Sequence, residues 1–128
     1  LRAAAQPPPR YATQADRWIR GPRANRGEEG ATIFERVLAR FRSLIRSGEY
    51  VLSIHALDEM AQDDILTEDV ENVILTGSII ERQIDHATRD RKYVLIGRDL
   101  ADCPVGLVAK IGPAGKAMVI TVYREEEP

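Results

Sequence analysis

The chain has 128 residues, of which 44% are hydrophobic and 30% charged, a composition typical of a soluble globular protein. This length suffices for one domain with a real core and is too short for two. No apolar run approaches the roughly 20 residues that cross a membrane. The single cysteine, Cys103, excludes an intrachain disulfide framework and a cysteine-based zinc site. We therefore expect a cytoplasmic, reducing setting without secretion.

The net charge of −2 hides a strong segregation of charge along the chain. Residues 1–50 carry ten arginines and five acids, residues 51–80 carry seven carboxylates and no Lys or Arg, and residues 81–128 carry eight charges of each sign. Two interpretations of the acidic segment are open. It is either a solvated helical face or a surface that repels nucleic acid and docks a basic partner.

Residues 1–31 are predicted to form a flexible basic arm ahead of a single domain over residues 32–128. Proline and glycine interrupt any helical period in this stretch, notably at Pro7-Pro8-Pro9, and six arginines lie among few apolar residues. Its basic and aromatic side chains could contact nucleic acid, but disorder explains the composition more simply.

Three helices and a short strand are predicted between residues 32 and 77. The first helix starts at Thr32, with Glu35 completing a capping box, and presents arginines such as Arg40 on its exposed side. A strand over 50–54 then leads into a helix over 55–63 that starts from a strand-end serine. A third helix is capped by Thr67 and ends at Thr76-Gly77. The apolar stripe of the first helix comprises Ile33, Phe34, Val37, Leu38, Phe41, Leu44 and Ile45.

The rest of the chain is predicted to be sheet, with strands over 78–85, 92–97, 105–111 and 117–124 separated by turn residues. The last strand is almost continuously apolar, which indicates a central position with both faces largely covered. The fold class is therefore α+β, with N-terminal helices packed on one face of a small, mainly antiparallel sheet of three to five strands.

Candidate chemistry centres on the helix at 55–63. Helical spacing places His55, Glu59 and Asp63 on one polar face, and Ala56, Leu57, Met60 and Ala61 on the packed side. A histidine suits proton transfer because the unperturbed pKa of its side chain type lies near neutrality, but His55 could equally cap the helix or bond a buried carbonyl. A metal site formed by His55, Glu59 and Asp63 is the least favoured reading, because three residues over two turns rarely converge on one ion.

Two other residues, Tyr123 and Cys103, are candidates for a chemical role. Tyr123 could assist proton transfer or simply pack on a core strand. Cys103 lies in a turn with no cationic partner that the sequence places beside it, so a nucleophilic role is not favoured.

Four sequence elements, in one order and spacing, point to a known family. They are the pattern Ser53-x-His55-Ala56-x-x-Glu59-Met60-x-x-Asp63-x-Ile65, then Asp69-Val70-Glu71 with Gly77 and Ile79-Ile80-Glu81, then Lys92-Tyr93-Val94 with Gly97, and finally Val119-Ile120-Thr121-Val122-Tyr123. Over residues 33–124 they resemble domain of unknown function (DUF) 4258, a family similar to the RelE/ParE-like toxins. The chain departs from the family at Glu59 and Asp63, where many relatives carry arginines, and at Gly106, where many carry a histidine.

This resemblance implies the toxin half of a toxin–antitoxin pair, with an antitoxin encoded nearby and an endoribonuclease activity on mRNA, free or on the ribosome, that needs no metal or cofactor. RNA cleavage requires a base, an acid and cations for the phosphorane charge. The resemblance and this chemistry together assign catalytic roles to His55, Tyr123, Arg91 and Arg98. They assign RNA or phosphate binding to Lys92, Lys110, Arg124 and Arg40.

A second hypothesis is a non-catalytic protein–protein module of the same fold. It would bind its partner through the acidic surface at residues 58–71 or through an open sheet edge.

Overall fold

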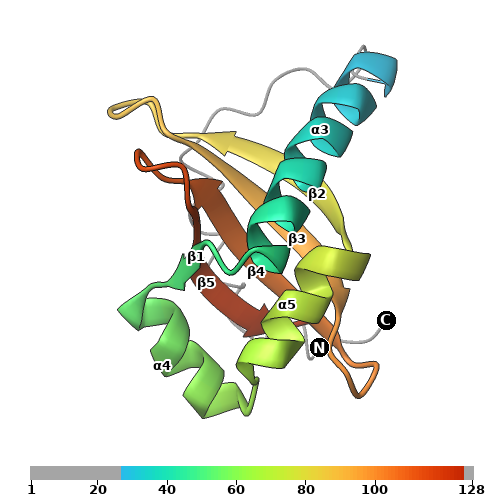
Figure 1. Cartoon of the computed structure of the whole chain (residues 1–128), viewed down its shortest axis with the longest axis vertical. Helices are drawn as coiled ribbons and strands as arrows, with labels where there is room; N and C mark the ends of the chain where they lie inside the picture. The colour runs from blue at the N-terminus through green and yellow to red at the C-terminus, as the bar shows by residue number, and fades with distance from the viewer. Residues whose placement is uncertain (1–26, 126–128) are drawn as a thin grey trace, which may run out of the picture.

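The computed structural model describes residues 27–125, with side chains described from Ile33 onward. The predicted arm therefore falls largely outside the described residues. In chain order the elements are α3 (Gly27–Arg46), β1 (Tyr50–Leu52), α4 (Ile54–Asp63), α5 (Thr67–Thr76), β2 (Ser78–Ile84), β3 (Arg91–Arg98), β4 (Pro104–Ile111) and β5 (Ala117–Arg124) (Figure 1).

The strands form one five-stranded sheet in the order β1-β5-β4-β3-β2. Strands β2 to β5 are an antiparallel meander, and β1 pairs with β5 in parallel. The predicted α+β class is confirmed. The central position of the last strand is also confirmed, because β5 lies between β1 and β4 and its side chains are mostly buried.

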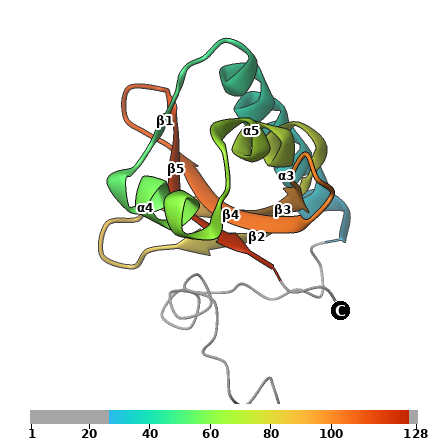
Figure 2. The same cartoon turned by 90° about the horizontal axis from the view of Figure 1, so that it is seen from below.

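The helices lie on one side of the sheet, with α5 over β3, α3 against α5 and β2, and α4 beside β5 (Figure 2). Phe41 of α3 is fully buried, and its ring meets that of Tyr93 on β3 edge to face, with centroids 5.9 Å apart. The predicted stripes of α3 and α5 pack into this core, including Ile45, Val70 and Ile74. Ile33, predicted as part of the α3 stripe, is instead 37% exposed, because it lies ahead of the part of the helix that reaches the core. No helix in the described part of the chain is long and apolar enough to cross a membrane.

Two predicted helix starts are wrong. Helix α3 begins at Gly27, five residues before Thr32, since a glycine such as Gly30 costs a helix only about 1 kcal/mol and does not force its end. Helix α5 is capped by Leu66 rather than Thr67. The carboxylate of Asp69 accepts a hydrogen bond from the Leu66 N–H at 2.9 Å, so an acidic side chain in the first turn provides an acceptor for a backbone N–H at the start of the helix.

Helix α5 is held at both ends by long-range hydrogen bonds. At its start, the second carboxylate oxygen of Asp69 accepts the N–H of Leu100 at 2.9 Å. At its end, the guanidinium of Arg42 donates to the carbonyls of Ile74 at 3.0 Å and Gly77 at 2.9 Å. A cation at a helix C-terminus is favourable, and here it ties α3 to α5.

Candidate functional site

The structure does not gather the predicted catalytic residues into one cluster. His55 lies in the first turn of α4 and Tyr123 near the end of β5. Arg91 and Arg98 occupy the two ends of β3, seven positions apart, which corresponds to about 23 Å along an extended strand. The two arginines therefore cannot serve the same reacting phosphate.

Several of the cations predicted to take part in catalysis or phosphate binding have partners within the fold. Lys110 pairs with Asp90 at 2.9 Å, and Arg98 donates to the carbonyl of Asp102 at 2.9 Å. Lys92 lies on β3 opposite Gln83 of β2. Arg40 is exposed on α3.

Arg124 joins the end of β5 to two loops. It pairs with the buried carboxylate of Asp99 at 2.7 Å and donates to the carbonyls of Asp63 and Asp64 at the end of α4. The hydrogen bond from Arg124, with those from the backbone of Cys103 and Ala101, holds the pKa of Asp99 below its ordinary value.

Tyr123 is a packed residue in this fold. Its side chain is 8% exposed, and its ring lies directly across Gly106 on the neighbouring strand. A Cβ added at Gly106 would come within 2.3 Å of the ring. The residue at 106 is therefore small because the tyrosine ring occupies the place of its side chain.

Around His55 the structure forms a short chain of polar contacts. His55 Nε2 lies 3.3 Å from Glu59 Oε2. The other oxygen of Glu59 accepts hydrogen bonds from the hydroxyl of Thr121 and, at 3.0 Å, from the N–H of Val122. The helix is capped by Ser53, whose hydroxyl oxygen accepts the N–H of Ala56 at 3.0 Å, so His55 does not act as the cap.

The predicted solvent-exposed placement of Glu59 is wrong, because its side chain is only 3% exposed. Strand β1 ends at Leu52, and α4 packs beside β5 past that point. The Glu59 carboxylate accepts a β5 N–H there that a longer β1 would have paired. Among the described residues, no three His, Cys, Asp or Glu side chains are placed to hold a metal ion.

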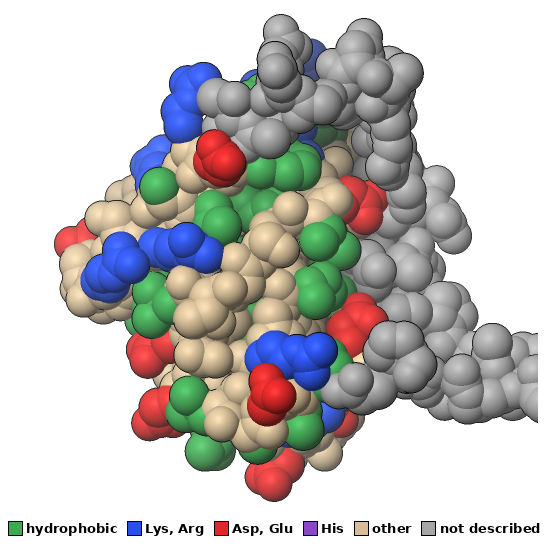
Figure 3. All heavy atoms as spheres, turned by 90° about the vertical axis from the view of Figure 1, so that its right-hand side faces the viewer, with side chains coloured by type: hydrophobic (Ala, Val, Ile, Leu, Met, Phe, Trp, Pro, Cys, Tyr) green, Lys and Arg blue, Asp and Glu red, His purple; other side chains and the backbone are tan. Residues whose placement is uncertain are grey.

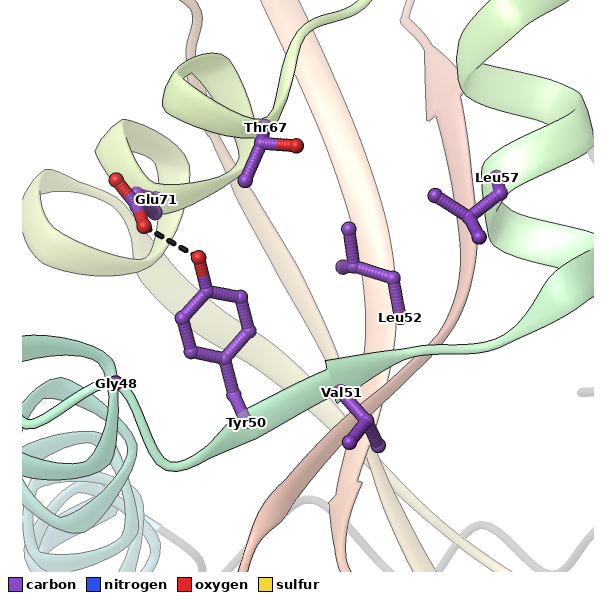
Figure 4. A pocket seen from close by; sticks show the side chains of 7 residues that line it. All are labelled: Gly48, Tyr50, Val51, Leu52, Leu57, Thr67 and Glu71. Atoms are coloured by element: carbon purple, nitrogen blue, oxygen red, sulfur yellow. Dashed lines mark hydrogen bonds between the residues drawn. The ribbon is translucent and has the colours of Figure 1, made fainter.

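An open groove of about 570 Å³ lies between α4, β1 and the start of α5 (Figure 4). Tyr50 and Leu52 point from β1 into it, Leu57 faces Leu52 from α4, and Thr67 lies above. We call this the α4–β1–α5 groove. It is lined by Gly48, Tyr50, Val51, Leu52, Leu57, Thr67 and Glu71, although the side chain of Val51 points to the other side of the strand.

One end of the groove is acidic. The Tyr50 hydroxyl donates a hydrogen bond to Glu71, and the charge of Glu68 also acts on it. Burial, followed by the hydrogen bond and charge of Glu71, raises the pKa of Tyr50 to about 12. Tyr50 is therefore a neutral donor at physiological pH, and the negative charge at this end belongs to the two glutamates.

The other end of the groove is apolar and exposed. Leu57 and Ala61, expected on the packed side of α4, face solvent; Leu57 is 47% exposed. Ile54, one helical turn before Leu57, is 79% exposed, and Leu66 in the α4–α5 connection is 59% exposed. Helical spacing had grouped Leu57 with Ala56 and Met60. The sheet edge meets α4 along a narrower stripe, which leaves Leu57 outside the core.

The side of the molecule away from α4 has a different character. In Figure 3, the Lys and Arg side chains of the described residues occur at separate places among acidic and apolar ones and form no continuous basic patch in this view.

Comparison with known proteins identifies the family. Residues 52–124, more than half of the chain, match the model of the family described as Domain of unknown function (DUF4258). No curated protein and no solved structure matches the chain. The match begins at the end of β1 and closes with β5, so it spans α4, the groove-facing start of α5 and the antiparallel meander. This chain belongs to the DUF4258 family.

Proposed function

We propose that this protein is a protein-binding module whose α4–β1–α5 groove holds a partner segment that carries both apolar and basic side chains. The observation that carries the proposal is the exposure of Ile54, Leu57 and Leu66 near a groove whose far end holds Glu68 and Glu71.

The apolar half of this surface supports binding because clustered exposed side chains gain free energy when a partner removes them from water. Ile54 and Leu57 lie one turn apart on α4, and Leu57 faces Leu52 across the groove. Leu52 itself packs against the core and so forms a fixed floor.

The charged half supports a basic partner. Residues 51–80 contain seven carboxylates and no Lys or Arg, so no cation within this stretch neutralises Glu68 and Glu71. A Lys or Arg of a partner meets complementary charge there, whereas an acidic partner or a nucleic acid is repelled.

Selection of random dodecapeptides displayed on phage against the whole chain tests this proposal. We expect selected peptides to combine Lys or Arg with apolar residues, and the Leu57→Asp variant to bind them at least about tenfold more weakly, because a carboxylate then lies against their apolar side chains. Leu57 is exposed, so the variant retains the fold, which circular dichroism verifies.

Leu100→Asp is the matched control, since Leu100 is 65% exposed in the turn between β3 and β4. We expect it to bind the selected peptides as the original chain does. The proposal is wrong if no peptide is selected, or if the two variants bind equally.

A second candidate is the endoribonuclease half of a toxin–antitoxin pair, acting on mRNA in the cytoplasm with a RelE/ParE-like fold. The contact of exposed His55 with buried Glu59 favours it, because a carboxylate that orients an imidazole suits that ring to proton transfer from a ribose 2′-hydroxyl. In this candidate the antitoxin is the partner that fills the groove.

An RNA degradation assay with purified protein, and growth after induction, test this second candidate. We expect cleavage by the original chain and at least about a hundredfold loss in His55→Ala, a typical contribution of one general acid or base. His55 is 56% exposed, so its removal leaves the fold intact. Intact RNA and normal growth with the original chain would reject the activity.

A further inference from the structure

We infer that the segment bound in the α4–β1–α5 groove is an extended strand that adds to the outer edge of β1, with a basic side chain at Glu68 and Glu71 and an apolar one at Leu52 and Leu57. This inference rests on the proposed protein-binding function and specifies its mode.

The register of β1 leaves one edge of this strand open. The carbonyl of Glu49 accepts the N–H of Ala117 at 3.1 Å, and the N–H of Ser53 donates to Val119 at 3.0 Å. Because alternate residues of a strand face the same neighbour, residues 49, 51 and 53 face β5. Tyr50 and Leu52 therefore direct their N–H and C=O groups away from β5.

Strand β1 is the terminal strand of the sheet, so the outward groups of Tyr50 and Leu52 face no other strand of the described chain. Such an edge is a template for an added strand. A helix laid over the same edge would remove these groups from water without supplying partners for them.

The side chains of β1 determine what the added strand carries. Tyr50 and Leu52 point to the same side, into the groove, and are two residues apart (Figure 4). Residues two apart on a paired strand also share a face, at a strand separation of about 4.8 Å. One residue of the added strand therefore lies beside Tyr50 and the glutamates, and the residue two positions away lies beside Leu52 and Leu57.

The acidic end of the groove selects the first of these residues. Tyr50 donates a hydrogen bond to Glu71 and keeps its proton, so two carboxylates and an aromatic ring face the incoming side chain. A Lys or Arg there pairs with Glu68 or Glu71 and contacts the ring of Tyr50. The predicted motif is thus a basic residue and an apolar residue separated by one position.

Peptides selected from the random dodecapeptide library test this mode once their dependence on Leu57 has been measured. Each backbone amide of the tightest peptide is N-methylated in turn. We expect methylation of alternate amides in the motif to weaken binding about tenfold, and methylation of the intervening amides to change it less than about twofold, because only alternate N–H groups face β1.

The charged contact is tested by Glu71→Gln, which keeps an acceptor for Tyr50. We expect this variant to weaken the basic peptide several-fold and to leave unchanged an analogue with norleucine in place of Lys or Arg. Asp102→Asn, in the exposed β3–β4 turn, is the control and should change neither.

The outcomes separate the two proposals. Groove-dependent peptides whose basic and apolar residues lie three or four apart, or whose amides respond to methylation without alternation, overturn strand addition and leave the protein-binding function standing. If no selected peptide binds the Leu57→Asp variant more weakly than the original chain, the proposed protein-binding function itself is wrong.

Discussion

Replacing Gly77 with alanine is expected to lower the free energy of unfolding by about 3 kcal/mol, the upper end of typical overpacking costs. Gly77 follows α5 at the place where the helix end meets β3. A Cβ added there would lie 2.4 Å from the carbonyl oxygen of Ile96 and 2.5 Å from that of Val73. Both atoms belong to backbone held in a strand and a helix, so neither can rotate away.

Gly97, which lies opposite Gly77 on β3, also allows α5 and β3 to approach closely. Gly97 of β3 lies against Gly77, with the Cα of Gly97 3.0 Å from the Cβ that Gly77 lacks. A methyl group at 77 must therefore separate α5 from β3. This separation also disturbs the hydrogen bond between Arg42 and the Gly77 carbonyl.

Urea unfolding measures this prediction, with Gly112→Ala as the matched control. A Cβ at Gly112 meets only the carbonyl of Lys116, at an ordinary 3.6 Å, and we expect a change below about 1 kcal/mol there. Equal stabilities of the two alanine variants would mean that α5 and β3 separate without cost.

Glu59→Met is expected to lower the free energy of unfolding by about 3 kcal/mol. Methionine fills a similar volume but accepts no strong hydrogen bond, so the Thr121 hydroxyl and the Val122 N–H lose their acceptor. Each buried donor left without a partner costs about 1–3 kcal/mol. Thr121 is 1% exposed and Val122 fully buried, so water does not replace the carboxylate readily.

Glu59→Gln is the control for this substitution, because its amide oxygen still accepts from both donors. We expect it to lose about 1 kcal/mol, and hydrogen exchange of the Val122 N–H to accelerate in the methionine variant but little in the glutamine variant. Unchanged or increased stability of Glu59→Met would show that desolvating the carboxylate costs as much as its hydrogen bonds contribute.

Repeating local patterns identified the elements of this fold. Apolar residues at three- and four-residue steps predicted α3 and the buried stripe of α5, and short apolar runs between turn residues predicted all four strands of the meander. The order of helices before strands was sufficient to predict the α+β class. These features depend on near neighbours in the chain, which the sequence displays directly.

The candidate site was harder to predict from the sequence than the fold was. His55 was identified from its residue type and position, and the order and spacing of the motifs identified the family. The same helical spacing placed Glu59 in solvent, yet it is buried. It also placed Leu57 in the core, although it is 47% exposed. Periodicity reports which residues share a helical face, but not how wide a stripe the neighbouring sheet covers.

The sequence by itself determined the elements, the fold class, the acidic stretch at 51–80 and the family. Only the tertiary structure decided that β1 ends after three residues beside a longer β5. It also decided that Glu59 accepts the Val122 N–H at that edge, and that Arg42 donates to a carbonyl at the end of α5. The α4–β1–α5 groove depends on the same packing. The physical reason is that each of these contacts joins residues far apart in the chain. A local sequence pattern does not indicate which distant side chain will bond a backbone group that helix or sheet pairing leaves without a partner.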